Sequence, residues 1–222
     1  MKSFLAGALF FIPLMSIISP SRANDGVPPE IPVRDFFRNP EITGFQLSPS
    51  GEQLAFLKPV DSRLNVFVQP TTGGEAKEIT RVKDRDIGGF FWKGDHYILY
   101  LKDNGGDENF HLYVAHSDGS EERDLTPFDG VKAEMIDDLE DIPNEVIVGL
   151  NKRNKEIFDA YRLNVETGNL EMIAENPGNI SSWVTDHDGK IRAAVTTDGV
   201  NTSLLYRKTE QDPFKTVITT NF

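Results

Sequence analysis

The chain has 222 residues, of which 38% are hydrophobic and 26% charged, and its formal net charge is −12 at pH 7. An acidic surface repels phosphate backbones, so the composition argues against a nucleic-acid partner. The chain contains no cysteine, which excludes disulfides, thiolate metal sites and cysteine nucleophiles. A stable fold must therefore come from buried apolar side chains and backbone pairing.

Residues 1–23 have the pattern of a secretory signal peptide. Lys2 precedes an apolar run from Phe4 to Ile18, and Ser21-Arg22-Ala23 places small residues where a signal peptidase cleaves. The run is short and interrupted by Pro13, so a membrane span is disfavoured, although an uncleaved anchor is the alternative. Cleavage leaves 21 basic and 35 acidic residues, a net charge of −14. We expect a periplasmic or secreted protein that does not stay on the membrane.

Residues 24–43 form a Pro-rich lead-in to the rest of the chain. Within it, the stretch VRDFFRNPEI at residues 33–42 predicts one helical turn that ends before Pro40, since proline cannot continue a helix.

The stretch GFQLSPSGEQLAFL at residues 44–57 is a β-hairpin signal, because two apolar runs flank a Ser-Pro-Ser-Gly turn. The following stretch, LNVFVQPTTGGEAKEIT, predicts a third strand, a turn at Gly73-Gly74 and a fourth strand. The same order of strands and turns recurs three more times, with turns at Asp118-Gly119, Thr167-Gly168 and Asp212-Pro213.

Two positions mark the period of this repeat. Each predicted third strand contains an aromatic residue, and from one repeat to the next these residues are 46, 48 and 45 positions apart. Apolar residues of the predicted fourth strands have the same three spacings. The first set is Phe67, Tyr113, Tyr161 and Tyr206, and the second is Ile79, Leu125, Ile173 and Ile218. Four strands per unit at this period are typical of a β-propeller blade.

The fold class predicted is therefore all-β, a β-propeller with four four-stranded blades at about residues 44–88, 89–134, 135–181 and 182–222. A helical solenoid is excluded by the alternation of apolar residues at period two. A β-sandwich would have no reason to keep both positions in step. Because the chain stops directly after a predicted fourth strand, we expect it to be a truncated part of a seven- or eight-bladed ring.

The blade motifs resemble those of one peptidase family. Ser48-Pro49-Ser50-Gly51, Leu54-Ala55-Phe56 and Gly73-Gly74-Glu75-Ala76 follow the blade pattern of the N-terminal propeller of secreted prolyl oligopeptidase family serine peptidases. The stretches RDIGGFFWKGD and LKDNGGDENFHLYV point to their acylaminoacyl-peptidase and dipeptidyl-aminopeptidase-like branch. Ser50 replaces the usual aspartate, and both residues suit a turn. The resemblance covers residues 31–222 and implies a propeller that caps a C-terminal α/β-hydrolase domain, which would hold a Ser-Asp-His triad and act on peptides.

The chain itself lacks the catalytic elements of such an enzyme. A hydrolase of this type needs a nucleophilic serine in a Gly-x-Ser-x-Gly turn, and that motif does not occur in the 222 residues. Ser50 and Ser120 are interpreted as turn residues. We therefore expect no catalytic residue and no peptidase activity from this chain alone.

No metal or cofactor is expected either. His111 and His116 flank one predicted strand and point to opposite faces, so they do not converge on a metal. His187 lies in TDHDGK, which lacks the twelve-residue ligand series of a calcium loop and is interpreted as a hairpin turn.

The candidate binding residues are Asp107 and Glu108, in the loop DNGGDEN between the second and third strands of blade two. One hypothesis is that either carboxylate faces the mouth of the propeller and binds the free amine of a peptide. The alternative is a solvated hairpin tip. Phe91, Trp92 and Tyr97 are interpreted as packing residues between blades rather than as ligand platforms.

Three functions remain open from sequence. The first is the non-catalytic, substrate-gating propeller of an exported serine peptidase. The second is a stand-alone exported TolB-like propeller that binds a protein partner. A third, a propeller enzyme such as a lactonase, would need converging metal ligands, and the sequence offers no consistent set.

Overall fold

The computed structural model describes residues 30–221, so the expected signal peptide at residues 1–23 lies outside the described part. The chain divides into two compact units, residues 1–38 and residues 39–222. In the first, α1 (Val33–Phe36) is a single turn that ends before Pro40, as the sequence predicts. Among the described residues, no helix is long and apolar enough to cross a membrane.

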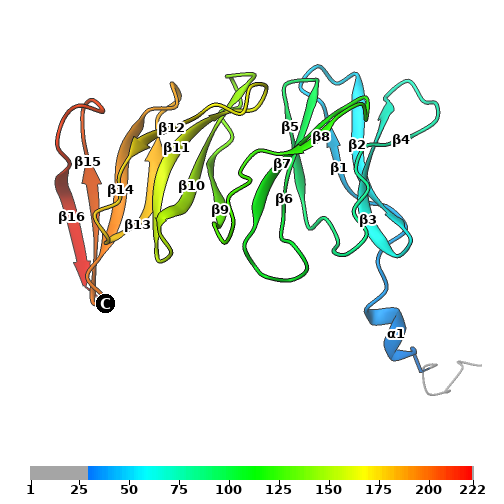
Figure 1. Cartoon of the computed structure of the whole chain (residues 1–222), viewed down its shortest axis with the longest axis horizontal. Helices are drawn as coiled ribbons and strands as arrows, with labels where there is room; N and C mark the ends of the chain where they lie inside the picture. Colours follow the sequence, from blue (N-terminus) through cyan, green and yellow to red (C-terminus); the bar gives the residue numbers. More distant parts are fainter. Residues whose placement is uncertain (1–29, 222) are drawn as a thin grey trace, which may run out of the picture. The chain divides into compact units, whose positions relative to one another are not determined.

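The second unit consists of four antiparallel sheets of four strands each, which we call blades 1 to 4 (Figure 1). Strands in each sheet pair in sequence order, which confirms the predicted fold class. Blade 1 holds β1 (Thr43–Leu47), β2 (Gln53–Val60), β3 (Arg63–Pro70) and β4 (Lys77–Glu78). Blade 2 holds β5 (Phe90–Lys93), β6 (Tyr97–Lys102), β7 (His111–His116) and β8 (Glu122–Asp124).

Blade 3 holds β9 (Ala133–Asp137), β10 (Glu145–Asn154), β11 (Ile157–Asn164) and β12 (Leu170–Ala174). Blade 4 holds β13 (Ile180–Thr185), β14 (Ile191–Thr197), β15 (Asn201–Tyr206) and β16 (Lys215–Asn221). β9 and β13 each begin two residues before the blade boundaries expected at 135 and 182. Ala133 already pairs with Leu150 of β10, and Ile180 with Thr196 of β14. Pairing with the second strand of each blade therefore begins before the expected boundary.

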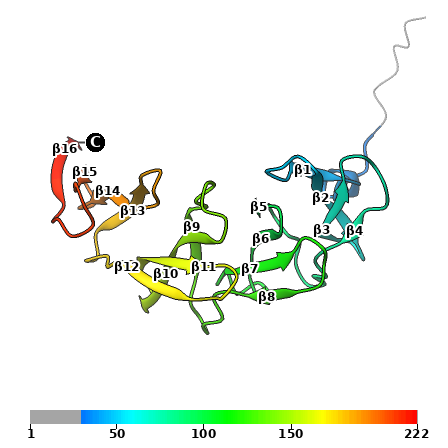
Figure 2. The same ribbon diagram turned by 90° about the horizontal axis from the view of Figure 1, so that it is seen from above.

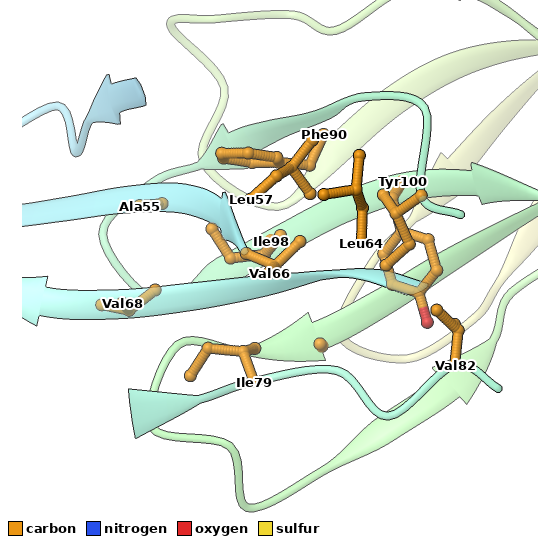
Figure 3. Close-up of a cluster of buried hydrophobic side chains, with 12 residues drawn as sticks. Ala55, Leu57, Leu64, Val66, Val68, Ile79, Val82, Phe90, Ile98 and Tyr100 are labelled. Atoms are coloured by element: carbon orange, nitrogen blue, oxygen red, sulfur yellow. The ribbon is translucent and has the colours of Figure 1, made fainter. Parts of the chain in front are cut away.

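The four blades follow one another side by side in chain order (Figure 2). Three clusters of buried apolar side chains hold them together, each at the junction of two successive blades. The first joins Val66 and Ile79 of blade 1 to Phe90 and Tyr100 of blade 2 (Figure 3). Since no blade has a core of its own, each one is stabilised by packing against its neighbour.

Polar side chains also bridge the junctions at about one repeat length. The indole nitrogen of Trp92 donates to the carbonyl of Gln46 at 3.2 Å, and the Gln46 side chain donates to the carbonyl of Phe90 at 2.6 Å. One junction further, Lys93 donates to the carbonyl of Leu139 at 2.7 Å. Such bonds satisfy backbone carbonyls that packing of the blades would otherwise leave without partners.

The fourth-strand position of the repeat packs toward the next blade in three of the four blades. Ile79, Leu125 and Ile173 each pack into the cluster shared with the following blade. Ile79 and Leu125 lie one residue past the ends of β4 and β8, yet their N–H groups still donate to the third strand, to the carbonyls of Val66 and Leu112, both at 2.8 Å. Ile218 lies within β16 and is 56% exposed.

The third-strand positions do not keep one register, which corrects the expectation. Tyr113 and Tyr161 pack toward the preceding blade. In blade 4 the residue that does so is Leu205, while Tyr206 is 48% exposed. Neighbouring residues of a strand point to opposite faces, so this one-residue difference reverses the side chain. The spacing of 45 residues from Tyr161 to Tyr206 thus matches two residues that face opposite ways.

Candidate functional site

The loop that holds both predicted site residues lies between β6 and β7, as expected from the sequence. The carboxylate of Asp107 accepts hydrogen bonds from the N–H groups of Asn104 and Asn109, at 3.3 and 3.1 Å, and from the side-chain amide of Asn109 at 3.2 Å. These bonds, the one from the Asn109 side chain foremost, lower the pKa of Asp107. Asp107 therefore closes its own loop.

Glu108 has a backbone in the left-handed region, with φ of 59°, which is uncommon for a residue with a side chain. Its N–H donates to the carboxylate of Asp103 at 3.3 Å. None of the residues 30–221 forms an ion pair or hydrogen bond with the Glu108 carboxylate. The loop thus presents this carboxylate to the solvent.

Asp103 anchors the loop and was not singled out by the sequence. Its side chain is only 2% exposed and pairs with the Nε atom of Arg85 at 3.3 Å. Arg85 comes from the segment that links blade 1 to blade 2, so this ion pair ties the loop to that segment. A buried carboxylate needs such partners, because burial without them is costly.

A pocket of about 760 Å³ lies beside Asp103 and Arg85, at the junction of blades 2 and 3. Most of the pocket surface is apolar, and its lining also includes acidic and basic side chains. Its lining residues come from β5, β6 and β9, from the segments before β5 and β9, and from the loop between β6 and β7: Arg85, Asp86, Gly88, Gly89, Phe90, Phe91, Tyr100, Leu101, Lys102, Asp103, Phe110, Lys132, Ala133, Glu134 and Met135. Asp107 and Glu108 lie near it in sequence but are not among these residues. A concave, largely apolar site with a few polar groups is typical of ligand binding.

Glu134 occupies a notch in the neighbouring strand. It pairs directly with Gly149 of β10, and a Cβ atom at that glycine would lie 2.7 Å from Cγ and 2.8 Å from Oε1 of Glu134. Gly149 does not have a positive φ, so it is needed here for space rather than for backbone conformation. Glu134 is an exposed residue, but partial desolvation of its carboxylate raises its pKa, while the positive charge of Lys132 opposes this effect.

The aromatic residues predicted to pack between blades do so. Trp92 packs against the first cluster, and Phe91 and Tyr97 against the second. Phe91 also lines the pocket, so packing and lining are not exclusive roles. Tyr100, which also lines the pocket, is fully buried, stacks on Tyr113 with ring centres 5.4 Å apart and is hydrogen-bonded to Glu122.

The histidines lie apart from this pocket. His111 is hydrogen-bonded to Asp124 at 2.6 Å, while His116 contacts Asp118 at 2.8 Å and stacks on His96. His187 lines a small acidic pocket of about 290 Å³ between blades 3 and 4. Across residues 30–221, no three His, Asp or Glu side chains come together in a way that could hold a metal ion.

Two serines considered from the sequence lie in turns. The N–H of Ser50 donates to Asp95 of blade 2 at 2.9 Å, and the N–H of Ser120 donates to Asp118 at 2.8 Å. In both cases the bond stabilises the turn itself or its contact with the next blade. Neither bond activates a hydroxyl.

Comparison with known proteins relates the chain to peptidases, although no family model matches it. Dipeptidyl aminopeptidase BIII of Pseudoxanthomonas mexicana is 31% identical over 227 residues, an alignment that covers 96% of this chain and 33% of that protein. This chain is thus similar to one third of a dipeptidyl aminopeptidase over nearly its whole length. Dipeptidyl peptidase family member 6 of Caenorhabditis elegans is 24% identical over 209 residues, covering 89% of this chain and 27% of that protein.

Comparison with solved structures supports the fold. A crystal structure from Bacteroides ovatus, assigned as a dipeptidyl aminopeptidase IV, matches 81% of this chain and 29% of its own with a TM-score of 0.55 and 13% identity. The sequence match to dipeptidyl aminopeptidase BIII confirms the predicted resemblance to peptidases, and the structural match confirms the propeller fold. The chain spans about a third of the length of the curated relatives it matches.

Proposed function

We propose that this chain is the non-catalytic, substrate-gating propeller portion of an exported serine peptidase that hydrolyses peptides. The observation that carries the proposal is homology to a dipeptidyl aminopeptidase over 96% of the chain. The chain has no Gly-x-Ser-x-Gly motif. In this proposal the catalytic serine, aspartate and histidine belong to a C-terminal α/β-hydrolase domain of the same polypeptide, within the prolyl oligopeptidase family.

The test compares two proteins, the 222-residue chain and the product of the complete gene. We expect only the second to hydrolyse dipeptide-based fluorogenic substrates and to be labelled by a fluorophosphonate, which modifies activated serines. A complete gene that ends without a Gly-x-Ser-x-Gly motif would refute the proposal. It would favour the alternative, a stand-alone TolB-like propeller that binds a protein partner.

Export is the second part of the proposal. We expect the protein recovered from the periplasm to begin at Asn24, since Ser21-Arg22-Ala23 ends a signal peptide pattern. Mass spectrometry of the N-terminal peptide measures this directly. A membrane-bound form that keeps Met1 would contradict it.

The third part assigns the free amine of the peptide to Asp107 or Glu108. Glu108 is the better placed of the two, because the carboxylate of Asp107 already accepts three hydrogen bonds within the loop. Losing a charge-assisted hydrogen bond costs about 1.5–3 kcal/mol, roughly tenfold or more in an equilibrium or rate constant. We therefore expect Glu108→Gln in the complete protein to lower kcat/KM for a peptide with a free amine by about tenfold.

The control for this measurement is the acetylated form of the same peptide, which carries no ammonium group. Its kcat/KM should change little in Glu108→Gln and in Asp107→Asn. If the ratio of free to acetylated peptide is the same in both variants as in the wild type, the loop is a solvated turn without a role in amine binding.

A further inference from the structure

Asparagine followed by glycine occurs once in the chain, at Asn104-Gly105 in the loop between β6 and β7. In such a pair the backbone nitrogen of the glycine can attack the side-chain carbonyl carbon of the asparagine. A side chain on the second residue hinders this attack, and glycine has none. The pair is therefore a candidate for spontaneous modification, a property that the proposed function does not use.

The structure leaves this pair open to solvent. Asn104 and Gly105 are both exposed, whereas Asp103 directly before them is 2% exposed and ion-paired with Arg85. Gly105 has φ of 66°, and a Cβ atom placed on it would have no atom of the described residues within 4 Å beyond its chain neighbours. Water and dissolved base can thus reach the backbone nitrogen of Gly105.

The hydrogen bonds that hold the pair are long. The N–H of Gly105 donates to the carboxylate of Asp84 at 3.4 Å, and the N–H of Asn104 donates to that of Asp107 at 3.3 Å. The carbonyl of Asn104 accepts a bond from the N–H of Asp107 at 3.4 Å. Well-formed bonds of this kind measure about 2.7–3.2 Å. All three lie outside the pairing of β6 with β7, which is typical of a segment that opens easily.

We propose that Asn104 is a deamidation site, at which the chain converts a side-chain amide into a carboxylate without an enzyme. The backbone nitrogen of Gly105 bonds to Cγ of Asn104, and the bond from Cγ to Nδ2 breaks. The amide group leaves as ammonia, with the proton of the attacking nitrogen. Water then opens the resulting succinimide at either carbonyl, which gives aspartate or isoaspartate. Only water is consumed, and no group is oxidised or reduced.

The modification changes the loop that carries Asp107 and Glu108. Either product adds one negative charge to a segment that is already acidic. Isoaspartate also adds a methylene to the backbone within residue 104, so the two bonds between residues 104 and 107 cannot both keep their geometry. The inference does not rest on peptidase activity, and a complete protein without such activity would leave it unchanged.

The test is peptide mapping of the 222-residue chain during storage at mildly alkaline pH. Trypsin cleaves after Lys102 and Arg123, which releases the loop as one peptide. We expect this peptide to gain, with time, the small mass of an amide-to-acid exchange, and fragment ions to place the gain at Asn104 rather than at Asn109. The Asp-Gly pairs of the chain do not contribute, because their isomerisation changes no mass.

Asn169 is the matched control within the same molecule. It is also exposed and lies between β11 and β12, but Leu170 follows it. Its amide should remain intact over the period in which Asn104 is largely converted. Equal conversion at the two sites would overturn the proposal, because the glycine would then have no effect.

A synthetic peptide of residues 101–112 separates the loop structure from the sequence. Because the hydrogen bonds of the pair are long, we expect Asn104 in the folded chain to be converted at a rate within severalfold of that in the peptide. Conversion in the peptide with lasting protection of the folded chain would overturn the proposal.

Two variants provide the converse test. Asn104→Gln needs a larger ring for the same attack and should gain no mass at residue 104, and Gly105→Ala should slow the conversion severalfold. We expect both variants to fold, since both positions are exposed and Gly105 has open space around it. A mass gain at residue 104 that persists in Asn104→Gln, or an unchanged rate in Gly105→Ala, would contradict the assignment.

Discussion

The face of blade 1 that meets blade 2 and the corresponding face of blade 4 begin from similar sequences and end in different environments. Ile79 and Ile218 occupy the same position of the repeat, and each is followed by a threonine. Ile79 is 1% exposed, whereas Ile218 is 56% exposed. Val217 next to it is 61% exposed. The comparison shows that burial at this position depends on a neighbouring blade and not on the strand itself.

The largest expected difference concerns these two isoleucines. Ile79→Ala should lower the free energy of unfolding by about 2–5 kcal/mol, because it leaves a cavity between blades 1 and 2. Ile218→Ala removes the same atoms from a surface and should change it by no more than about 0.5 kcal/mol. Urea unfolding of both variants measures the contrast. Similar losses in the two variants would mean that Ile218 is covered in solution.

The next expectation concerns a charge buried at the junction of blades 2 and 3. Lys93 is 2% exposed and donates hydrogen bonds to the carbonyls of Asp138 and Leu139, the latter at 2.7 Å. Burial lowers the pKa of its ammonium group from 10.5 to about 8, although Asp138, Asp137 and Glu145 oppose the change. The native state therefore releases this proton at a lower pH than the unfolded chain does.

The lower pKa of Lys93 in the native state determines how its contribution to stability changes with pH. Between pH 8 and 10.5 the unfolded chain binds more protons at this site, so the contribution of Lys93 to stability increases with pH, by up to about 3 kcal/mol. The measurement is the difference in unfolding free energy between wild type and Lys93→Met at pH 7 and at pH 10. We expect the wild type to gain relative to the variant. A constant difference would show that the ammonium is not desolvated.

A smaller effect is expected at the two threonines that follow the isoleucines. The hydroxyl of Thr80 accepts a hydrogen bond from the buried N–H of Val66 at 2.9 Å, and Thr80 is fully buried. Thr80→Val leaves that N–H without this acceptor and should cost about 1–3 kcal/mol. Thr219, which is exposed and lies 2.8 Å from the hydroxyl of Ser203, is the matched control. Its valine variant should differ from the wild type by a few tenths of a kcal/mol. Comparable losses would indicate that the blade 4 threonine is buried by an association.

The last expectation concerns self-association of the chain, with little effect on the stability of the fold. Val184, Leu204, Tyr206, Val217 and Ile218 expose apolar surface on blade 4. Such surface favours self-association of the 222-residue chain. Ile218→Ser combined with Val217→Thr should lower the weight-average mass in sedimentation experiments at the same concentration. The chain is expected to self-associate without these changes, and a monomeric wild type would contradict the expectation.

The candidate site was only partly predictable from the sequence. The loop with Asp107 and Glu108 falls where it was expected, because glycines and acidic residues between two apolar strands mark a turn. Asp103, Glu134 and the pocket were missed, since the pocket brings together segments from two different repeats. One sequence signal was available: Gly149 lies inside an otherwise apolar predicted strand, and a glycine there often marks a close approach by another group.

The sequence by itself determined the four-stranded unit, its number of copies and the position of its turns, because these depend on alternation at period two and on local turn residues. It also determined that the catalytic motif of a serine hydrolase is absent from these residues. Only the tertiary structure decided that Leu205 rather than Tyr206 faces blade 3, that Ile79 is buried while Ile218 is exposed, and that Glu134 lies against Gly149. Each of these depends on strand register and on contacts between residues about 15 to 50 positions apart, which local patterns do not specify.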